Sequence, residues 1–282
     1  HCETALAEAE VEYQDVTSDS IYVRFEVLDK DKFLKAFNLS SLEKPCYMVI
    51  WTTTPWTIPS NLAISLHPDY EYGLYKFEGE YYVVAVELLS SFAKDIEKEE
   101  SDFELVAKTR GINLENIDTK HPILDRKSKI IVGEHVTLDA GTGAVHTAPG
   151  HGLEDWEVCQ KYGIETFSPL DKKGRWTNQV PELEGVYYEE GNDIVINKLT
   201  EAKALMKKTP VTHSYPHCWR CKQPVIYRAT PQWFVRVGDF MEKSLNAIKN
   251  VKWIPAAGEK RISNMVENRT DWCISRQRAW GV

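Results

Sequence analysis

The stretch Tyr47-Met48-Val49-Ile50-Trp51-Thr52-Thr53-Thr54-Pro55-Trp56-Thr57-Ile58-Pro59-Ser60-Asn61 combines a strand signal with an unusual loop. Its first five residues form a continuous apolar run, which is typical of a strand buried on both faces. Four threonines and two prolines follow, and they predict a rigid loop that displays hydroxyls at the end of this strand. Such hydroxyls can orient a water molecule or a ribose. The alternative is a turn that is merely rich in capping residues.

Strands are also predicted on both sides of this stretch. Apolar side chains alternate along residues 21–27, which indicates a half-buried strand. Residues 72–77 and 81–86 flank a turn at 78–80 and predict a hairpin. Helical patterns are found at residues 87–98, 151–162, 193–208 and 239–249. Strands therefore dominate the middle of the chain, with helices between them.

A second loop that carries candidate functional residues is Gly141-Thr142-Gly143-Ala144-Val145-His146-Thr147-Ala148-Pro149-Gly150-His151-Gly152-Leu153-Glu154-Asp155-Trp156. Its glycines let a ligand approach the backbone closely. The third glycine of a dinucleotide fingerprint and the lysine of a P-loop are missing, so phosphate binding is poorly supported. Asp155 in a first helical turn is favoured by the helix dipole alone, so it can be purely structural. His146 can likewise be a hydrogen-bonded histidine of the core.

The composition is that of a globular protein. The chain has 282 residues and 32.4 kDa, of which 43% are hydrophobic and 27% charged, and this argues against disorder and fibrous repeats. The length allows two domains, or one core with a satellite. The apolar runs are far shorter than the ~20 residues that cross a bilayer. The ends, His1-Cys2-Glu3 and Trp280-Gly281-Val282, lead us to expect a piece of a longer protein.

Charge is distributed unevenly along the chain. Residues 1–202 carry 19 basic and 37 acidic side chains, whereas residues 203–282 carry 15 and 5. A basic end on an acidic body suits an anionic polymer such as nucleic acid. A solvated basic face is an equally good interpretation from charge alone.

The cysteines predict a metal site and no disulfide framework. Of the six, only Cys218-Trp219-Arg220-Cys221 has the spacing of metal ligands, and Cys2 could belong to a second pair. Zinc held by thiolates at both ends would be structural, since no coordination position stays open. His213 and His217 are alternative ligands, and an inert or redox pair is the other interpretation.

Together the two loops resemble the two editing-site signatures of isoleucyl-tRNA synthetase, which lie in an insertion called connective peptide 1. Thr54, Trp56 and His146 match this enzyme where the valyl and leucyl enzymes typically differ. Cys2 with Glu8-Ala9-Glu10-Val11-Glu12-Tyr13, the Cys218 to Cys221 motif with residues 227–234, and residues 271–281 resemble the flanks of the same insertion. The resemblance covers nearly the whole chain.

The resemblance implies a mixed α/β fold. It consists of a β-barrel-like editing domain surrounded by helices, a small zinc-ribbon-like segment and the start of the return into a Rossmann-type catalytic core. We expect an N-terminal connecting segment that supplies half of the ribbon at residues 1–19, the editing domain at 20–208, the CxxC segment at 209–236 and the C-terminal segment at 237–282.

The activity implied by the resemblance is hydrolytic proofreading. Valine is isoleucine minus one methylene, and a pocket gains only about 1 to 3 kcal/mol from that group, a limit for which this amino-acid pair is itself the standard example. A second site must therefore accept the smaller product and hydrolyse its ester. The expected enzyme is an aminoacyl-tRNA ester hydrolase that deacylates valyl-tRNA(Ile), with valyl-adenylate as a further substrate. The HIGH and KMSKS signatures of the ATP-dependent activating reaction are absent, so no aminoacylation is expected.

Residue roles also follow from the resemblance. His146 would wall the side-chain pocket, Asp155 would pair with the substrate ammonium, and a water would attack directly without an acyl-enzyme. Thr53, Thr54 and Asn61 would position the terminal adenosine, the ester carbonyl and this water. The predicted catalytic residues are Thr53, Thr54, Asn61 and Asp155; the predicted substrate-binding residues are Trp51, Thr52, Trp56, Thr57, Gly143, His146, Ala148 and His151; the predicted metal ligands are Cys2, Cys218 and Cys221.

The implied partners are tRNA(Ile) mischarged with valine, valyl-adenylate and the remainder of the synthetase, in the cytoplasm and without a membrane. Editing would need no cofactor, and zinc would be structural in the full-length protein. A competing hypothesis is a tRNA-binding zinc-ribbon module without catalysis. The basic residues 203–282 and the Cys218 to Cys221 motif support it. A third is a truncated fragment that folds poorly.

Overall fold

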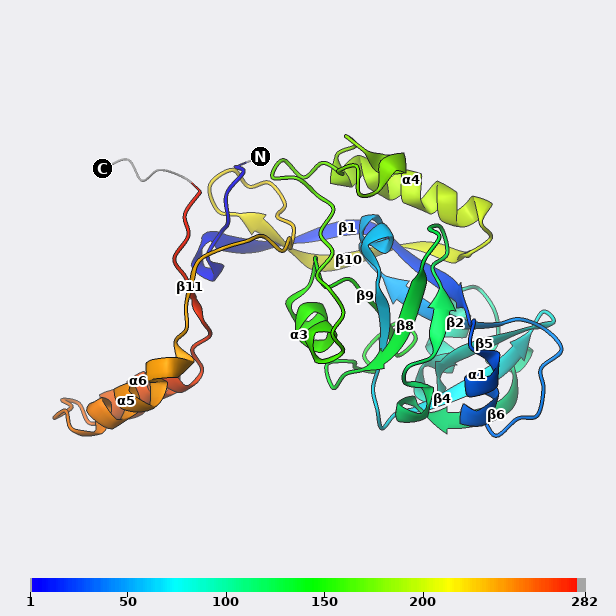
Figure 1. Ribbon diagram of the computed structural model, residues 1–282, viewed down its shortest axis with the longest axis horizontal. Coiled ribbons are helices and arrows are strands. Elements are labelled where there is room, and N and C mark those ends of the chain that lie inside the picture. Colours follow the sequence, from blue (N-terminus) through cyan, green and yellow to red (C-terminus); the bar gives the residue numbers. More distant parts are fainter. Residues whose placement is uncertain (1, 278–282) are drawn as a thin grey trace. The chain divides into compact units, whose positions relative to one another are not determined.

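The computed structural model describes residues 2–277, which divide into two units (Figure 1). The first unit comprises residues 6–229. The second joins residues 2–5 to the chain from residue 230 onward. Among the described helices, none is both long enough and apolar enough to span a membrane.

The first unit is built on one mixed sheet that curls into a half-barrel (Figure 1). Eight strands follow the order β6-β4-β5-β2-β9-β3-β8-β7, and β1 pairs with both β2 and β10. Parallel pairs join β2 to β5 and to β9, and β3 to β8. The strands are β1 (Val11–Glu26), β2 (Cys46–Thr52), β3 (Ala63–Leu66), β4 (Glu71–Phe77), β5 (Glu80–Ala85), β6 (Glu104–Arg110), β7 (Asp118–Lys120), β8 (Lys127–Val132), β9 (Ala144–Thr147) and β10 (Leu205–Cys218). The predicted mixed α/β class is confirmed.

Short helices surround this sheet. The α-helices of the first unit are α1 (Lys30–Ala36), α2 (Leu89–Asp95), α3 (Leu153–Lys161) and α4 (Tyr188–Glu201). The 3-10 helices are η1 (Glu8–Glu10), η2 (Pro55–Ser60), η3 (Val86–Leu88), η4 (Glu100–Asp102), η5 (Gly111–Leu114) and η6 (Pro181–Leu183). Helix α4 packs against η2, where the Asn192 side chain accepts a hydrogen bond from the Trp56 backbone N–H (3.0 Å). The loop at residues 52–61, called the threonine loop below, is therefore supported by helix α4.

Two groups of buried side chains hold these layers together. The main core includes Phe25, Ile50 and Ile64, all fully buried. A smaller cluster joins Ala63 of β3 and Ile131 of β8 to Val158 and Cys159 of α3. Because Val158 lies one helical turn after Asp155, this cluster fixes the start of α3 against the sheet.

Strand β2 and the hairpin of β4 and β5 lie where strands were predicted from the sequence. The residues of the hairpin turn explain why the two strands pair. The hairpin of β4 and β5 turns through Glu78 and Gly79, whose φ angles of 48° and 84° are both positive. A two-residue turn with two positive φ angles matches the right-handed twist of the strands it joins. The predicted helices at 87–98 and 151–162 are present as the shorter α2 and α3.

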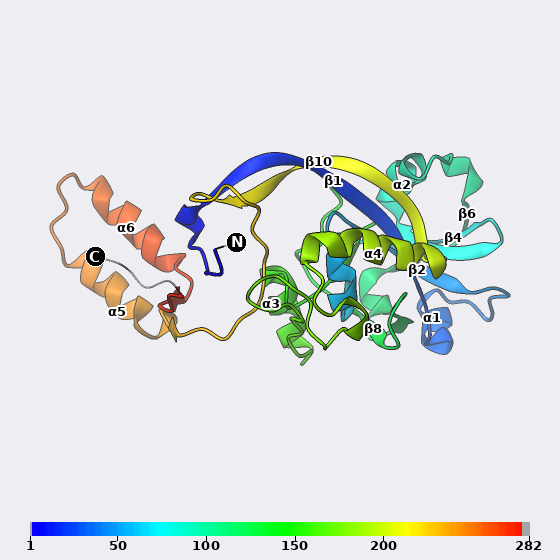
Figure 2. The same cartoon turned by 90° about the horizontal axis from the view of Figure 1, so that it is seen from above.

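The long β1–β10 ribbon was not foreseen. It pairs residues from Val11 with Cys218 to Val23 with Leu205, and Figure 2 shows it as a continuous arc. The predicted helix 193–208 is wrong at its end, because α4 stops at Glu201 and Lys203 takes a left-handed φ of 55° before β10 begins. The two strands also run through the expected domain limits at 19/20 and 208/209, since paired strands cannot be divided there.

The second unit is small. A two-stranded pair joins β11 (Phe234–Val235) to β12 (Trp272–Cys273), and α5 (Gly238–Lys249) lies beside α6 (Ala257–Glu267) (Figure 2). No residue of either helix is buried. The zinc-ribbon and Rossmann-return assignments stay predictions.

Candidate active site

Neighbouring strands bring the two predicted loops together. Strands β2 and β9 pair in parallel, with Trp51 opposite Val145, so the residues that follow Trp51 lie beside the glycine and histidine residues of the second loop. A cavity of about 390 Å³ lies between them. It is lined by Trp51, Thr52, Thr53, Thr54, Thr57, His135, Thr137, Asp139, Ala140, Gly141, Thr142, Gly143, Ala144, Val145, His146, Ala148, His151, Glu154 and Asp155. This volume is within the usual range of small-molecule sites.

Three threonine hydroxyls form a connected group on one wall of the cavity. The Oγ1 of Thr54 lies 3.2 Å from that of Thr52 and 3.3 Å from that of Thr57. The Thr57 hydroxyl donates to the Thr54 carbonyl (2.8 Å). Thr53 lines the cavity and its hydroxyl bonds to no other described side chain or backbone group. One hydroxyl is thus available to a ligand beside a fixed group of three.

His146 is held as a neutral ring of fixed tautomer. Asn61 donates from Nδ2 to the Ala63 carbonyl and to His146 Nδ1, both at 2.8 Å, so Nδ1 must be unprotonated. The Nε2–H then donates to Thr57 Oγ1 (2.9 Å). Burial lowers the pKa of His146 to about 3. With both nitrogens satisfied by protein, the ring can shape the cavity but is not available as a general base.

Two of the predicted site residues lie outside the cavity lining. The Asn61 side chain is fully buried and acts on the site through His146. Trp56 is also buried, with its ring 5.0 Å from His151 and 5.3 Å from Tyr188 between centroids. The sequence could not separate these supporting roles from ligand contact, because both residues stand in the same loop as those that line the cavity.

Asp155 places a carboxylate in the cavity. Its Oδ2 accepts a hydrogen bond from the Ala148 N–H (2.8 Å), whereas Oδ1 has no hydrogen-bond partner among the described residues. Burial raises the pKa of this carboxyl group, and the Ala148 N–H opposes that shift. A partly buried carboxylate with one open oxygen is suited to bind a cation such as an ammonium group.

His151 joins the cavity to the segment that follows the cysteine motif. Its Nδ1–H donates to the Tyr227 carbonyl (2.9 Å), so Nε2 accepts from the Ser60 hydroxyl (3.0 Å). Burial lowers the pKa of His151 to about 4. The adjacent Ala229 N–H donates to the Gly150 carbonyl (2.8 Å). His151 is therefore neutral near pH 7 and fixes the position of the loop.

The threonine loop is also held from the turn between β7 and β8. The Nε2–H of His121 donates to the Ile58 carbonyl (2.9 Å), and Arg126 donates to the Pro59 carbonyl. The backbone N–H groups of residues 123 and 124 donate to His121 Nδ1, which fixes its tautomer. Neither residue lines the cavity, so both position the loop from behind.

Two glycines of the second loop are required by protein packing. Gly143 has a φ of +74°, and a Cβ built on it would lie 2.5 Å from the Ala85 Cβ. A Cβ on Gly150 would lie 2.0 Å from the Phe167 carbonyl oxygen. From the sequence, these glycines were expected to let a ligand approach the backbone, but the neighbouring strand and loop already exclude any side chain there.

Nine residues that line the cavity were not predicted from the sequence. They are His135, Thr137, Asp139, Ala140, Gly141, Thr142, Ala144, Val145 and Glu154. Five of them belong to the quoted second loop, and the first four come from the segment before it, which carries no motif. The charged residues of the lining are all acidic, and no Lys or Arg is among the described lining residues. The cavity thus favours cationic groups over anionic ones.

The described residues of the site include no activated nucleophile. The described lining contains no Ser, Cys or Lys. Thr57 bonds to a histidine, but it accepts that hydrogen bond and cannot lose its proton to the same nitrogen. Burial raises the pKa of both Cys46 and Cys159 to about 12, so neither is a thiolate. Chemistry at this site would have to use a bound water.

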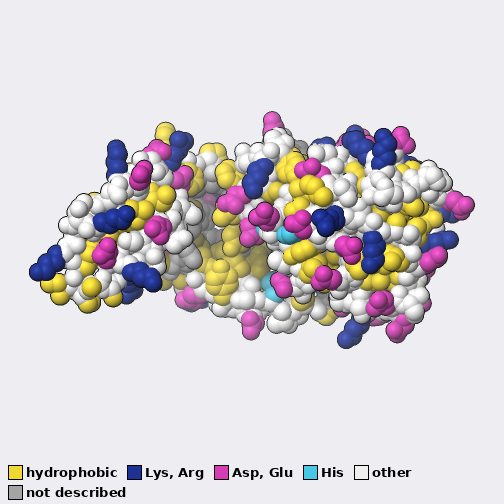
Figure 3. Space-filling model, turned by 90° about the horizontal axis from the view of Figure 1, so that it is seen from below, with side chains coloured by type: hydrophobic (Ala, Val, Ile, Leu, Met, Phe, Trp, Pro, Cys, Tyr) yellow, Lys and Arg dark blue, Asp and Glu magenta, His cyan; other side chains and the backbone are white. Residues whose placement is uncertain are grey.

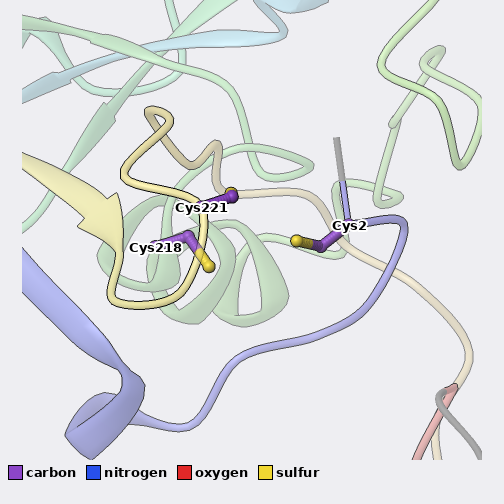
Figure 4. Close-up of side chains that lie close together, drawn as sticks. All are labelled: Cys2, Cys218 and Cys221. Atoms are coloured by element: carbon purple, nitrogen blue, oxygen red, sulfur yellow. The ribbon is translucent and has the colours of Figure 1, made fainter.

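The structure brings the three predicted metal ligands together. Cys218 is the last residue of β10 and Cys221 lies in the turn that follows. Their sulfur atoms and that of Cys2 are within 4.8 Å of one another (Figure 4). Thiolates suit zinc, which takes four ligands in structural sites. No fourth ligand joins this group within residues 2–277, and neither His213 nor His217 is part of it.

Comparison with known proteins gives consistent results over the whole chain. A family model described as tRNA synthetases class I (I, L, M and V) matches residues 1–282. An isoleucine–tRNA ligase of Thermoanaerobacter sp. (strain X514) is 56% identical over 283 residues, or 100% of this chain and 30% of that protein. One from Brevibacillus brevis is 53% identical over 280 residues, or 99% of this chain and 29% of that protein. The chain spans about 30% of the length of the curated relatives it matches.

Solved structures resemble the fold. A crystal structure of the P. knowlesi cytosolic leucyl-tRNA synthetase editing domain has a TM-score of 0.53 at 12% identity, covering 70% of this chain and 97% of that one. A crystal structure described as GlLeuRS-CP1 has a TM-score of 0.51 at 13% identity, covering 67% of this chain and 99% of that one. At these identities the likeness concerns the fold alone.

Proposed function

Because the chain belongs to the class I tRNA synthetases of the I, L, M and V group, we propose that it is a proofreading hydrolase that removes valine from mischarged tRNA(Ile). The observation that carries this proposal is the cavity between the threonine loop and the glycine and histidine loop, with an open Asp155 oxygen inside it. Aminoacyl esters have a free ammonium group, and the acidic lining suits it. The ester is favoured over valyl-adenylate, whose phosphate the acidic lining would repel.

The substrate would be oriented from both ends. Its ammonium binds Asp155 Oδ1, an interaction of charged groups that contributes about 1.5 to 3 kcal/mol. Its side chain points to the wall formed by His146 and Thr57, which are both buried. The ester carbonyl then lies near Thr53 and Thr54, between these two anchors.

Hydrolysis would proceed by direct attack of water on the ester carbonyl. The hydroxyls of Thr53 and Thr54 would hold the water and stabilise the oxyanion that develops, so orientation and electrostatics provide the rate. The bond from the carbonyl carbon to the ribose oxygen breaks, and valine and the free 3′ end of the tRNA leave. This requires no acyl-enzyme, in agreement with the absence of Ser, Cys and Lys from the described lining.

Selection would depend on size. His146 cannot move aside without breaking its bonds to Asn61 and Thr57, so an extra methylene on the substrate meets a fixed wall. Insertion of a methylene into a well-packed site costs about 1 to 3 kcal/mol. Valine therefore fits and isoleucine is rejected.

The decisive experiment measures ester loss from valyl-tRNA, isoleucyl-tRNA and valyl-adenylate, each mixed separately with the chain. We expect fast loss from valyl-tRNA alone. Equal rates for the two tRNA esters would exclude selection at this cavity, and an intact valyl ester would exclude hydrolysis altogether. The Asp155→Asn variant, which loses the charged contact to the ammonium group, serves as the matched control of reduced activity.

A structural zinc ion is a separate proposal. The thiolates of Cys2, Cys218 and Cys221 would hold it, with a fourth ligand from outside this group. Zinc would join the cysteine segments and supply no chemistry to the cavity. Mass spectrometry of the native chain tests it, and a mass that does not change on treatment with chelator would contradict it.

A further inference from the structure

None of the described residues that line the cavity is a cation that could bind the phosphate preceding the last nucleotide of an RNA. Its charged lining residues are Asp139, Glu154 and Asp155. An amino acid esterified to a terminal ribose lies one nucleoside away from the nearest phosphate. A group that binds this phosphate must therefore lie outside the cavity, close to its edge.

Residues 227–229 run along the edge of the cavity at His151. The contacts to this edge come from the backbone: the Tyr227 carbonyl binds His151 and the Ala229 N–H binds Gly150. The side chains of Tyr227 and Arg228 take no part in these two hydrogen bonds. They are therefore not needed to keep the edge closed.

Two tyrosines near this edge of the cavity are largely exposed to solvent, although large aromatic side chains usually pack in the interior. Tyr227 is 60% exposed, and Tyr13 of β1 is 62% exposed. The Val225 N–H donates to the Pro216 carbonyl, and Pro216 pairs with Tyr13 in the ribbon, so the two tyrosines belong to neighbouring chain segments. Burial and then the Tyr13 hydroxyl raise the pKa of Tyr227, which places the two hydroxyls together.

Arg228 supplies a positive charge beside these rings. Its guanidinium makes no hydrogen bond or ion pair with the residues that the structure describes, although Asp171 acts on it electrostatically. It lies close enough to His151 to help lower the pKa of that ring. On the face in Figure 3, acidic and basic side chains are interspersed, as expected for a solvated surface.

We propose that Tyr13, Tyr227 and Arg228 form a rim surface that binds the single-stranded 3′ end of an RNA next to the cavity. The exposed rings stack on unpaired bases, and the guanidinium binds the phosphate that the acidic cavity cannot hold. This inference rests on the proposed function, because it assumes that the terminal ester enters the cavity. It adds the route by which the RNA is recognised.

The test compares a long and a short ester. Valyl-tRNA spans both the rim surface and the cavity, whereas 3′-O-valyl-adenosine has no preceding nucleotide and fills the cavity alone. We expect Tyr227→Ala and Arg228→Gln each to raise KM for valyl-tRNA by about tenfold, since one stacked base or one phosphate contact is lost. The kcat/KM for 3′-O-valyl-adenosine should not change.

Matched variants separate recognition from folding. Tyr227→Phe keeps the ring and should retain the wild-type KM, and Lys108→Gln on β6 removes an exposed charge elsewhere. Arg228→Gln should also weaken the dependence of valyl-tRNA binding on salt by about one phosphate contact. An unchanged KM for valyl-tRNA in the Ala and Gln variants would overturn the proposal. Equal losses on both substrates would also overturn it, because the residues would then act through His151.

Failure of the proposed function has a different outcome. A wild-type chain that hydrolyses neither ester refutes proofreading. Binding of a fluorescent oligonucleotide with the sequence CCA at its 3′ end still tests the rim surface in that case. Weaker binding by Tyr227→Ala supports the surface, and equal binding by wild type and variant refutes it.

Discussion

Replacement of His146 by alanine tests the size selection most directly. The substitution removes the imidazole from the buried wall and leaves Thr57 and Asn61 in place. If the ring excludes isoleucine by bulk, the shortened wall should admit the extra methylene. The valyl ester fits the cavity with or without the ring, so its hydrolysis should change less.

The expected size of the effect follows from packing. The intact wall penalises one additional methylene by about 1 to 3 kcal/mol. Once space is available, burial of the same methylene gains about 0.8 kcal/mol. The preference for valine over isoleucine should therefore fall by about 2 to 4 kcal/mol, which is roughly 30- to 700-fold in the ratio of kcat/KM values.

The assay measures deacylation of the two tRNA esters under single-turnover conditions, well below the melting temperature of the variant. Loss of the ring leaves the Asn61 amide without one partner, at a cost of about 1 to 3 kcal/mol unless water replaces the nitrogen, so the melt is recorded as well. His146→Phe is the control, since it keeps the bulk and loses both hydrogen bonds. A folded His146→Ala variant that still spares isoleucyl-tRNA would refute the reasoning.

Three further predictions concern charge. Asp155→Asn should lower kcat/KM for valyl-tRNA by roughly 10- to 150-fold, from the loss of about 1.5 to 3 kcal/mol, and wild-type turnover would contradict the ammonium contact. Because burial raises the pKa of Asp155, the acid limb of the kcat/KM profile should lie above the ordinary Asp value of about 3.9, and full activity at pH 4 would speak against this role. Burial lowers the pKa of His121 to about 3 in the folded chain, below its usual 6.5, so its contribution to stability is present above pH 6.5 and is lost as pH falls. At pH 5 the loss should be about 2 kcal/mol, measured as a fall in the urea midpoint that is smaller in His121→Gln.

The sequence alone was sufficient for the strand that carries the site and for the chemistry of its loops. The apolar run 47–51 is the buried strand β2, because a run without polar residues has no face suited to solvent. The threonines were singled out from their local pattern, whereas His146 was assigned to the site by the family resemblance. The structure places them around one cavity. The mixed α/β class was implied by the family resemblance, and the local strand and helix patterns agree with it.

Local pattern could not reveal which loop residues face the ligand and which support it. Asn61 and Thr53 are both polar residues of one loop, yet Asn61 is fully buried against His146 and Thr53 lines the cavity. The difference depends on strands 80 or more residues apart, since β9 and β3 bring His146 beside the loop. No window of sequence contains that information.

The same reason explains the ribbon of β1 and β10 and the rim of the cavity. Residues 205–208 have helix-forming composition, but pairing with β1 across nearly 200 residues turns them into strand. Tyr227 was assigned no role in the site from the sequence, and its carbonyl reaches His151 only because the chain returns along this ribbon. Sequence determined what each segment is able to form and to bind, and long-range strand pairing decided which of those groups meet, because hydrogen bonds between distant strands outweigh local preference.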